Sequence, residues 1–143
     1  MSPERTSEPG VVFDIVFEDG LLFFELSNRA SVPVTKVVTA FRRPVLAPDG
    51  LTDLGSLTLF KKTEYLPPGK AIRVFVDTVA SYFARRQPNF VHVALTWKQR
   101  GKTLSTQISH DIRIYRDLPY VVGRGESVRR GASLANQINQ PRR

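Results

Sequence analysis

The chain lacks several features on which common functions depend. Its 143 residues include no cysteine, which excludes disulfide bonds, thiolate metal sites and cysteine nucleophiles. No stretch approaches the roughly 18 consecutive apolar residues that a membrane-spanning helix needs. Residues 1–10 are polar and lack the apolar core of a signal peptide. Together these absences fit a reducing compartment and favour a cytoplasmic location.

Catalytic motifs are scarce as well. The sequence has no Gly-x-Ser-x-Gly element, no Gly-x-Gly-x-x-Gly fingerprint and no phosphate-cradling loop. Serine and aspartate are plentiful, so composition does not exclude a serine–histidine–aspartate site, but neither His92 nor His110 has a recognisable catalytic setting. We therefore expect no enzyme, with no catalytic residue, no metal site, no cofactor and no small-molecule substrate.

The pattern of apolar runs and turns favours an all-β domain. Runs rich in β-branched and aromatic residues alternate with turn signals. These runs cover residues 11–17, 21–26, 34–41, 57–60, 71–77, 89–98 and 103–114. One short helical stretch at 78–86 stops before Pro88, whose ring disfavours helix in the residue before it. Seven short strands without alternating long helices predict an immunoglobulin-like antiparallel β-sandwich of about seven strands with one short helix.

Two hairpins can be placed from their turns. Asp19-Gly20 separates the first two strands, and glycine accepts a positive φ without steric cost. If Arg100-Gly101 is a two-residue loop, then Trp97 faces Leu104 and Val91 faces His110 across the last hairpin. This register places Trp97 in the core. It places His92 on the opposite face from His110, so we do not expect the two to share a metal ion.

Charge divides the chain into three segments. Residues 1–9 are expected to be a disordered N-terminal segment, residues 10–121 the sandwich, and residues 122–143 a basic flexible tail. The tail has five arginines against one glutamate and so carries half of the formal net charge of +8. Such an excess favours anionic partners: nucleic acid, acidic protein or lipid headgroups.

Three short segments resemble a known family. They are Leu26-Ser27-Asn28-Arg29-Ala30 leading into Val34-Thr35-Lys36-Val37, then Leu66-Pro67-Pro68-Gly69-Lys70, and the final hairpin with His110-Asp111-Ile112. Over residues 11–115 the chain resembles prokaryotic immunoglobulin-like domains of the bacterial cell-adhesion-related kind. The resemblance implies a sandwich fold and an accessory role, and it carries no catalytic residues.

Arginine pairs are candidate contacts to nucleic acid. The candidates are Arg42, Arg43, Arg85, Arg86, Arg124, Arg129, Arg130, Arg142 and Arg143. Each cation can neutralise a phosphate and release a counterion, and Tyr82 and Phe83 beside Arg85-Arg86 could add stacking on single strands. The alternative is that these charges, like Lys61-Lys62, solvate strand ends and protect sheet edges.

Aromatic residues are candidate contacts to a protein. The first two predicted strands contain more aromatic residues than one buried face requires, namely Phe13, Phe17, Phe23 and Phe24. Phe23 and Phe24 must point to opposite faces of their strand, so one of them lies outside the core unless a second layer covers it. This predicts a packed partner, either another copy of the chain or a different protein.

The leading hypothesis is a non-catalytic interaction or scaffolding module. It would bind a protein partner or itself through a sheet face or edge, with the basic tail as an additional tether. The alternative is a nucleic-acid-binding protein that uses the tail and the arginine pairs. Adsorption to a membrane surface is less favoured, because the tail has too few large apolar residues for an inserting helix.

Overall fold

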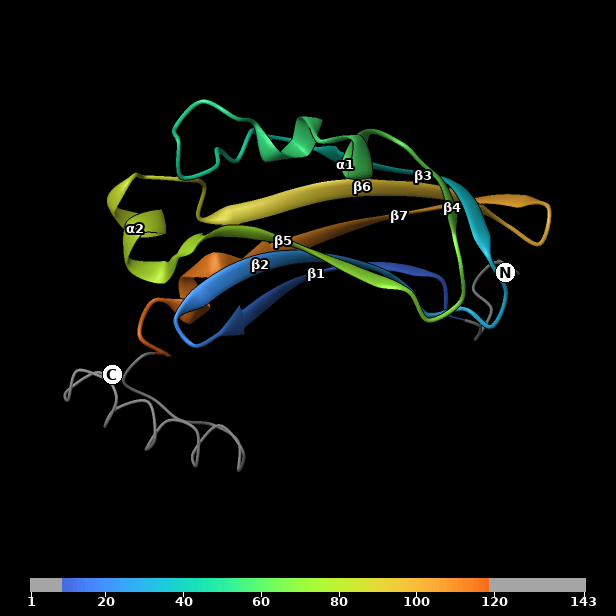
Figure 1. The fold of residues 1–143 in the computed structure, drawn as a ribbon, viewed down its shortest axis with the longest axis horizontal. Helices are drawn as coiled ribbons and strands as arrows, with labels where there is room; N and C mark the ends of the chain where they lie inside the picture. Colours follow the sequence, from blue (N-terminus) through green and yellow to red (C-terminus); the bar gives the residue numbers. More distant parts are fainter. Residues whose placement is uncertain (1–8, 119–143) are drawn as a thin grey trace.

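The computed structural model describes residues 9–118, whose regular structure is mainly β (Figure 1). The strands are β1 (Val11–Glu18), β2 (Leu21–Asn28), β3 (Val34–Phe41), β4 (Thr63–Leu66), β5 (Ala71–Thr78), β6 (Phe90–Gln99) and β7 (Lys102–Asp111). The helices are α1 (Thr58–Lys61) and α2 (Val79–Ala84), with 3-10 turns η1 (Leu54–Ser56) and η2 (Ile112–Tyr115).

The strands form two antiparallel sheets that face each other as layers of a sandwich (Figure 1). One sheet has the order β1-β2-β5 and the other the order β4-β3-β6-β7. Immunoglobulin sandwiches likewise keep the first, second and fifth strands together and group the third, sixth and seventh. Here the fourth strand joins the second of these groups. The predicted all-β sandwich is thus confirmed.

Both predicted hairpin turns are present. Asp19 and Gly20 have φ angles of 55° and 81°, and Arg100 and Gly101 have φ angles of 54° and 79°. Two successive positive φ angles define the turn whose twist matches that of the flanking strands. The predicted register of the last hairpin is confirmed, with Trp97 opposite Leu104 and Val91 opposite His110. Trp97 is 7% exposed and lies in the core, as predicted.

The predicted strand at 57–60 is wrong. This segment forms α1, and the fourth strand begins only at Thr63. The alternation of Leu57 and Leu59 suggested a strand. Yet Leu54, Leu57 and Phe60 recur every three residues, a helical spacing, and all three pack into or against the core. The predicted helix near 78–86 is confirmed as α2, where the Thr78 hydroxyl accepts a hydrogen bond from Ser81 N at 3.1 Å.

Aromatic rings fill the middle of the sandwich. The ring of Phe13 lies 5.2 Å from Phe24, 5.5 Å from Phe41 and 6.0 Å from Phe60, measured between centroids. Such tilted and edge-on pairs add to the stabilisation that burial of the rings provides. The cluster joins β1 and β2 to β3 and α1, so it holds the two sheets together.

One buried side chain connects two of the segments on which the family resemblance rests. Asn28, which is 1% exposed, donates from its amide to the carbonyls of Val32 and Leu66, and its Oδ1 accepts from Ala30 N. Its backbone also pairs with Gly69 and Lys70. Asn28 therefore fixes the end of β2 against the turn between β4 and β5.

Candidate functional site

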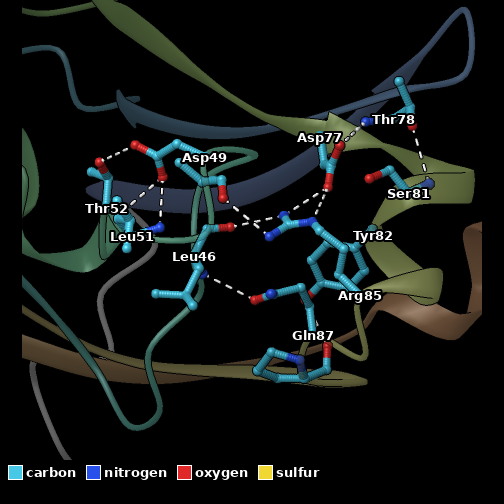
Figure 2. A network of polar contacts seen from close by, with 12 residues as sticks. Leu46, Asp49, Leu51, Thr52, Asp77, Thr78, Ser81, Tyr82, Arg85 and Gln87 are labelled. Carbon is cyan, nitrogen blue, oxygen red and sulfur yellow. Dashed lines mark hydrogen bonds and ion pairs between the residues drawn. The ribbon is translucent and has the colours of Figure 1, made fainter.

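Arg85, predicted as a nucleic-acid contact, is instead part of an internal network (Figure 2). Its Nε and Nη2 donate to Asp77 Oδ2 at 2.9 and 2.7 Å, and the Asp77 side chain is 4% exposed. Two further bonds of 3.0 Å reach the carbonyls of Leu46 and Ala47. The guanidinium is directed at these protein groups, so we do not place Arg85 in an anion-binding surface.

The same network holds the loop that follows β3 (Figure 2). Gln87 Oε1 accepts from Leu46 N at 2.9 Å. Asp49 accepts from the backbone N–H of Thr52, from its hydroxyl and from Leu51 N. These bonds favour the carboxylate and lower the pKa of Asp49 to about 2. These bonds fix residues 46–52 of the loop, which begins at Arg42-Arg43.

Arg42 and Arg43 are both exposed and line a shallow hollow of about 340 Å³ at one end of the four-stranded sheet. Asn89, Phe90 and His92 complete the lining. Arg42 N donates to the carbonyl of His92 at 2.9 Å, which fixes β3 and β6 side by side at this point. The hollow thus combines two predicted arginines with an aromatic ring and an imidazole.

Phe90 and Arg113 belong to this hollow or its rim, and sequence reasoning missed both. Phe90 is 40% exposed, and its ring stacks beside that of His92 at 6.2 Å. The Arg113 guanidinium lies 4.7 Å from the centre of the Phe90 ring. Arg113 also forms two side-chain hydrogen bonds to Asp111, which lower the pKa of that carboxyl. The alternation of β6 predicts Phe90 on the same face as His92, although it does not mark Phe90 as a site residue. Arg113 follows the last strand in a turn, where no sequence signal points to it.

The other basic candidates do not gather at this hollow. Arg86 is exposed and follows α2, with its backbone N–H bonded to Phe83. Tyr82 is buried and Phe83 is half-buried beneath Arg116, so neither ring beside Arg85-Arg86 is fully open for stacking. The predicted contacts Arg124, Arg129, Arg130, Arg142 and Arg143 lie outside the described residues.

Two of the four phenylalanines predicted at a protein interface lie in the core. Phe13 and Phe24 are each 1% exposed, because their strands turn them toward the opposite sheet. Their assignment to an interface is therefore corrected. Phe17 is half-buried and stacks on Tyr115 with 5.7 Å between centroids.

Phe23 does lie on the outer face of the three-stranded sheet. It pairs across the strands with Phe75, which is 43% exposed, and their rings meet edge-on at 5.9 Å. Arg73 crosses this face, with its guanidinium 5.7 Å from the Phe23 ring. It forms ion pairs of 3.0 Å with Glu18 and Glu25. The prediction that Phe23 and Phe24 point to opposite faces is confirmed.

The two histidines lie on opposite faces of the four-stranded sheet, as the register predicts. His110 faces inward, with Nε2 3.0 Å from the carbonyl oxygen of Phe13. Within residues 9–118, no three histidine, cysteine or acidic side chains come together in a way that could hold a metal ion. No helix in that range is long and apolar enough to cross a membrane.

Comparisons with known proteins add no relative. No family model, no curated protein and no solved structure matches the chain.

Proposed function

We propose that this chain is a non-catalytic, immunoglobulin-like interaction module that docks a protein partner through the outer face of its three-stranded sheet. The observation that carries the proposal is the Phe23–Phe75 pair, which presents an aromatic surface outside the core. Exposed aromatic rings that neighbouring groups hold rigid are typical of interface hot spots. Here two ion pairs fix Arg73, and its guanidinium packs against the Phe23 ring.

The charge around the pair indicates the partner's chemistry. Asp14, Glu18 and Glu25 share the outer face with Arg73, so this face is acidic in a chain whose formal net charge is +8. A symmetric dimer through this face would bring the carboxylates of both copies together, and like charges facing each other across an interface are unfavourable. We therefore assign the face to a different protein, with an apolar side chain that contacts Phe75 and flanking lysine or arginine residues. The basic segment 122–143, which lies outside the described residues, would serve as a second attachment in this proposal.

The test is a peptide-display selection on the full-length chain. The expected result is enrichment of peptides with one aromatic or leucine residue flanked by basic residues. Phe75→Thr should abolish their binding, because it removes the exposed ring but keeps a residue suited to a strand. Phe90→Thr is the matched control, since Phe90 is a strand residue of similar exposure on the other sheet, and should leave binding unchanged.

Two results would overturn the proposal. One is enriched peptides that bind Phe75→Thr as well as they bind the unmodified chain. The other is a dimer of the full-length chain, seen by light scattering, that Phe75→Thr converts to monomer, because the occupant of the face would then be a second copy.

A further inference from the structure

The outer face of the four-stranded sheet differs in chemistry from the acidic face across the sandwich. Along β6 and β7, small and hydrogen-bonding side chains face outward between two ends that each have an aromatic ring and a cation nearby. These residues, with Tyr65 and Arg42, form what we call the platform: Phe90, His92, Ala94, Thr96 and Lys98 from β6, and Thr103, Ser105, Gln107 and Ser109 from β7. No bulky side chain interrupts the middle of the platform.

Aromatic rings stand near both ends. Phe90, 40% exposed, lies at the end with the hollow. Tyr65, 58% exposed, lies at the other end, because it pairs with Thr35, and Thr35 in turn pairs with Lys98. Phe90 and Lys98 are eight residues apart on β6, which corresponds to about 26 Å in an extended strand. That length can hold several nucleotides.

Cations are present at both ends and carboxylates are nearly absent. Arg42, Arg43 and Arg113 surround the hollow, and Lys98 lies at the far end. The four strands of this sheet contain two acidic residues. Arg113 holds Asp111 of β7 through two side-chain hydrogen bonds, and Lys62 pairs with Glu64 of β4 at 3.1 Å. A bound anion would therefore meet positive charge with little repulsion.

We propose that the platform binds single-stranded nucleic acid. The phosphates would contact Arg42, Arg43 and Lys98. One unstacked base would lie on the exposed ring of Tyr65, and another would displace the Arg113 guanidinium from the ring of Phe90. The hydroxyl and amide side chains of β7 can bond to base edges without selecting one sequence. A duplex buries the faces of its bases, which then cannot stack on protein rings, so the aromatic ends of the platform favour a single strand. This inference is independent of the proposed function, because it uses the opposite sheet.

The test measures fluorescence anisotropy of a labelled, mixed-sequence oligonucleotide of about 12 nucleotides, titrated with the full-length chain at about 50 mM and about 200 mM salt. Phe90→Thr should weaken binding about tenfold, the effect of one lost stacking contact. Phe75→Thr, on the other sheet, should leave it unchanged. In the peptide test Phe75→Thr is the test variant and Phe90→Thr the control, whereas here the two exchange these roles. Either proposal can therefore fail without the other.

A second pair of variants separates the platform from general charge. Arg42→Gln with Arg43→Gln should weaken binding about tenfold at low salt. It should also lower the number of counterions released on binding, measured from the slope of log affinity against log salt concentration, by between about one and two. Arg29→Gln with Lys70→Gln removes the same charge from exposed positions at the far end of the sandwich. It should weaken binding less than about threefold.

Three outcomes would overturn the inference. Equal losses in the two charge variants would show that binding follows net charge alone. A duplex of the same sequence that binds as tightly as the single strand would remove the role of the rings. Polyglutamate that competes as well as unlabelled oligonucleotide would show that any anionic chain satisfies the platform.

Discussion

Asp77 is 3% exposed, and Arg85 reaches it with two hydrogen bonds that enter the same oxygen, Oδ2, from Nε and Nη2. The same guanidinium donates to the carbonyls of Leu46 and Ala47, so one side chain joins α2 to β5 and to the loop after β3 (Figure 2). A buried carboxylate depends on such a partner, because transfer from water costs it several kcal/mol.

We expect Arg85→Gln to lower the free energy of unfolding by about 3 kcal/mol, because Asp77 would remain buried without its cation. The double variant Asp77→Asn with Arg85→Gln should lose less than the sum of the two single changes. Urea denaturation followed by the fluorescence of Trp97, the single tryptophan, measures all three. Additive losses would show that the two side chains act separately.

Gly10 lies against the indole ring. A Cβ placed on Gly10 would stand 2.6 Å from Trp97 Cζ2 and 2.9 Å from Gln99 Oε1, the atom that accepts the indole N–H. Gly10→Ala should therefore destabilise the fold by about 2 kcal/mol through overpacking. The neighbouring change Pro9→Ala, at an exposed residue, should cost less than about 0.5 kcal/mol. Equal effects in urea denaturation would show that the ring yields to the added methyl group.

Acid should weaken the turn that follows β3. Since folding lowers the pKa of Asp49 from 3.8 to about 2, its stabilising contribution is complete above about pH 4 and is lost as the pH falls through about 2. Asp49→Asn keeps the Oδ1 acceptor but cannot titrate. The difference in unfolding free energy between the unmodified chain and this variant should therefore shrink across that window. A difference that stays constant between about pH 5 and about pH 2 would contradict the assignment.

Strand β1 lies at the edge of its sheet, and side chains from the other layer cover two of its carbonyls. Tyr115 donates to Ile15 O at 3.4 Å, and His110 Nε2 lies beside Phe13 O. Uncovered edges pair with other chains. We expect Tyr115→Ala to raise the fraction of oligomer seen by light scattering at high protein concentration. Tyr65→Ala, which exposes no edge of β1, should not change it.

The sequence predicted most where a local rule decides the structure. Asp19-Gly20 and Arg100-Gly101 each set a two-residue turn, and the turn sets the register of every pair in its hairpin. Trp97 could be assigned to the core for that reason alone. At 57–60 two periodicities competed, and tertiary packing of Phe60 decided for the helix.

The candidate sites were less predictable, because both depend on residues far apart in the chain. Alternation shows that Phe23 and Phe24 point to opposite faces of their strand, but only the position of the opposing sheet decides which of them is covered. Arg85 looks like a surface cation until Asp77, eight residues earlier, is brought beneath it. Arg113 reaches Phe90 because β7 returns beside β6 and η2 turns the chain back over it.

The directions of the first and last strands determine how the domain responds to tension. The described chain enters the sandwich at one end and leaves at the other, since β1 and β7 run in the same direction along its long axis (Figure 1). Tension applied between Val11 and Asp111 would therefore shear β1 along β2 and β7 along β6. Shear strains many ladder hydrogen bonds at once, whereas peeling breaks them one at a time. The domain should therefore behave as a stiff element when it is pulled along its length.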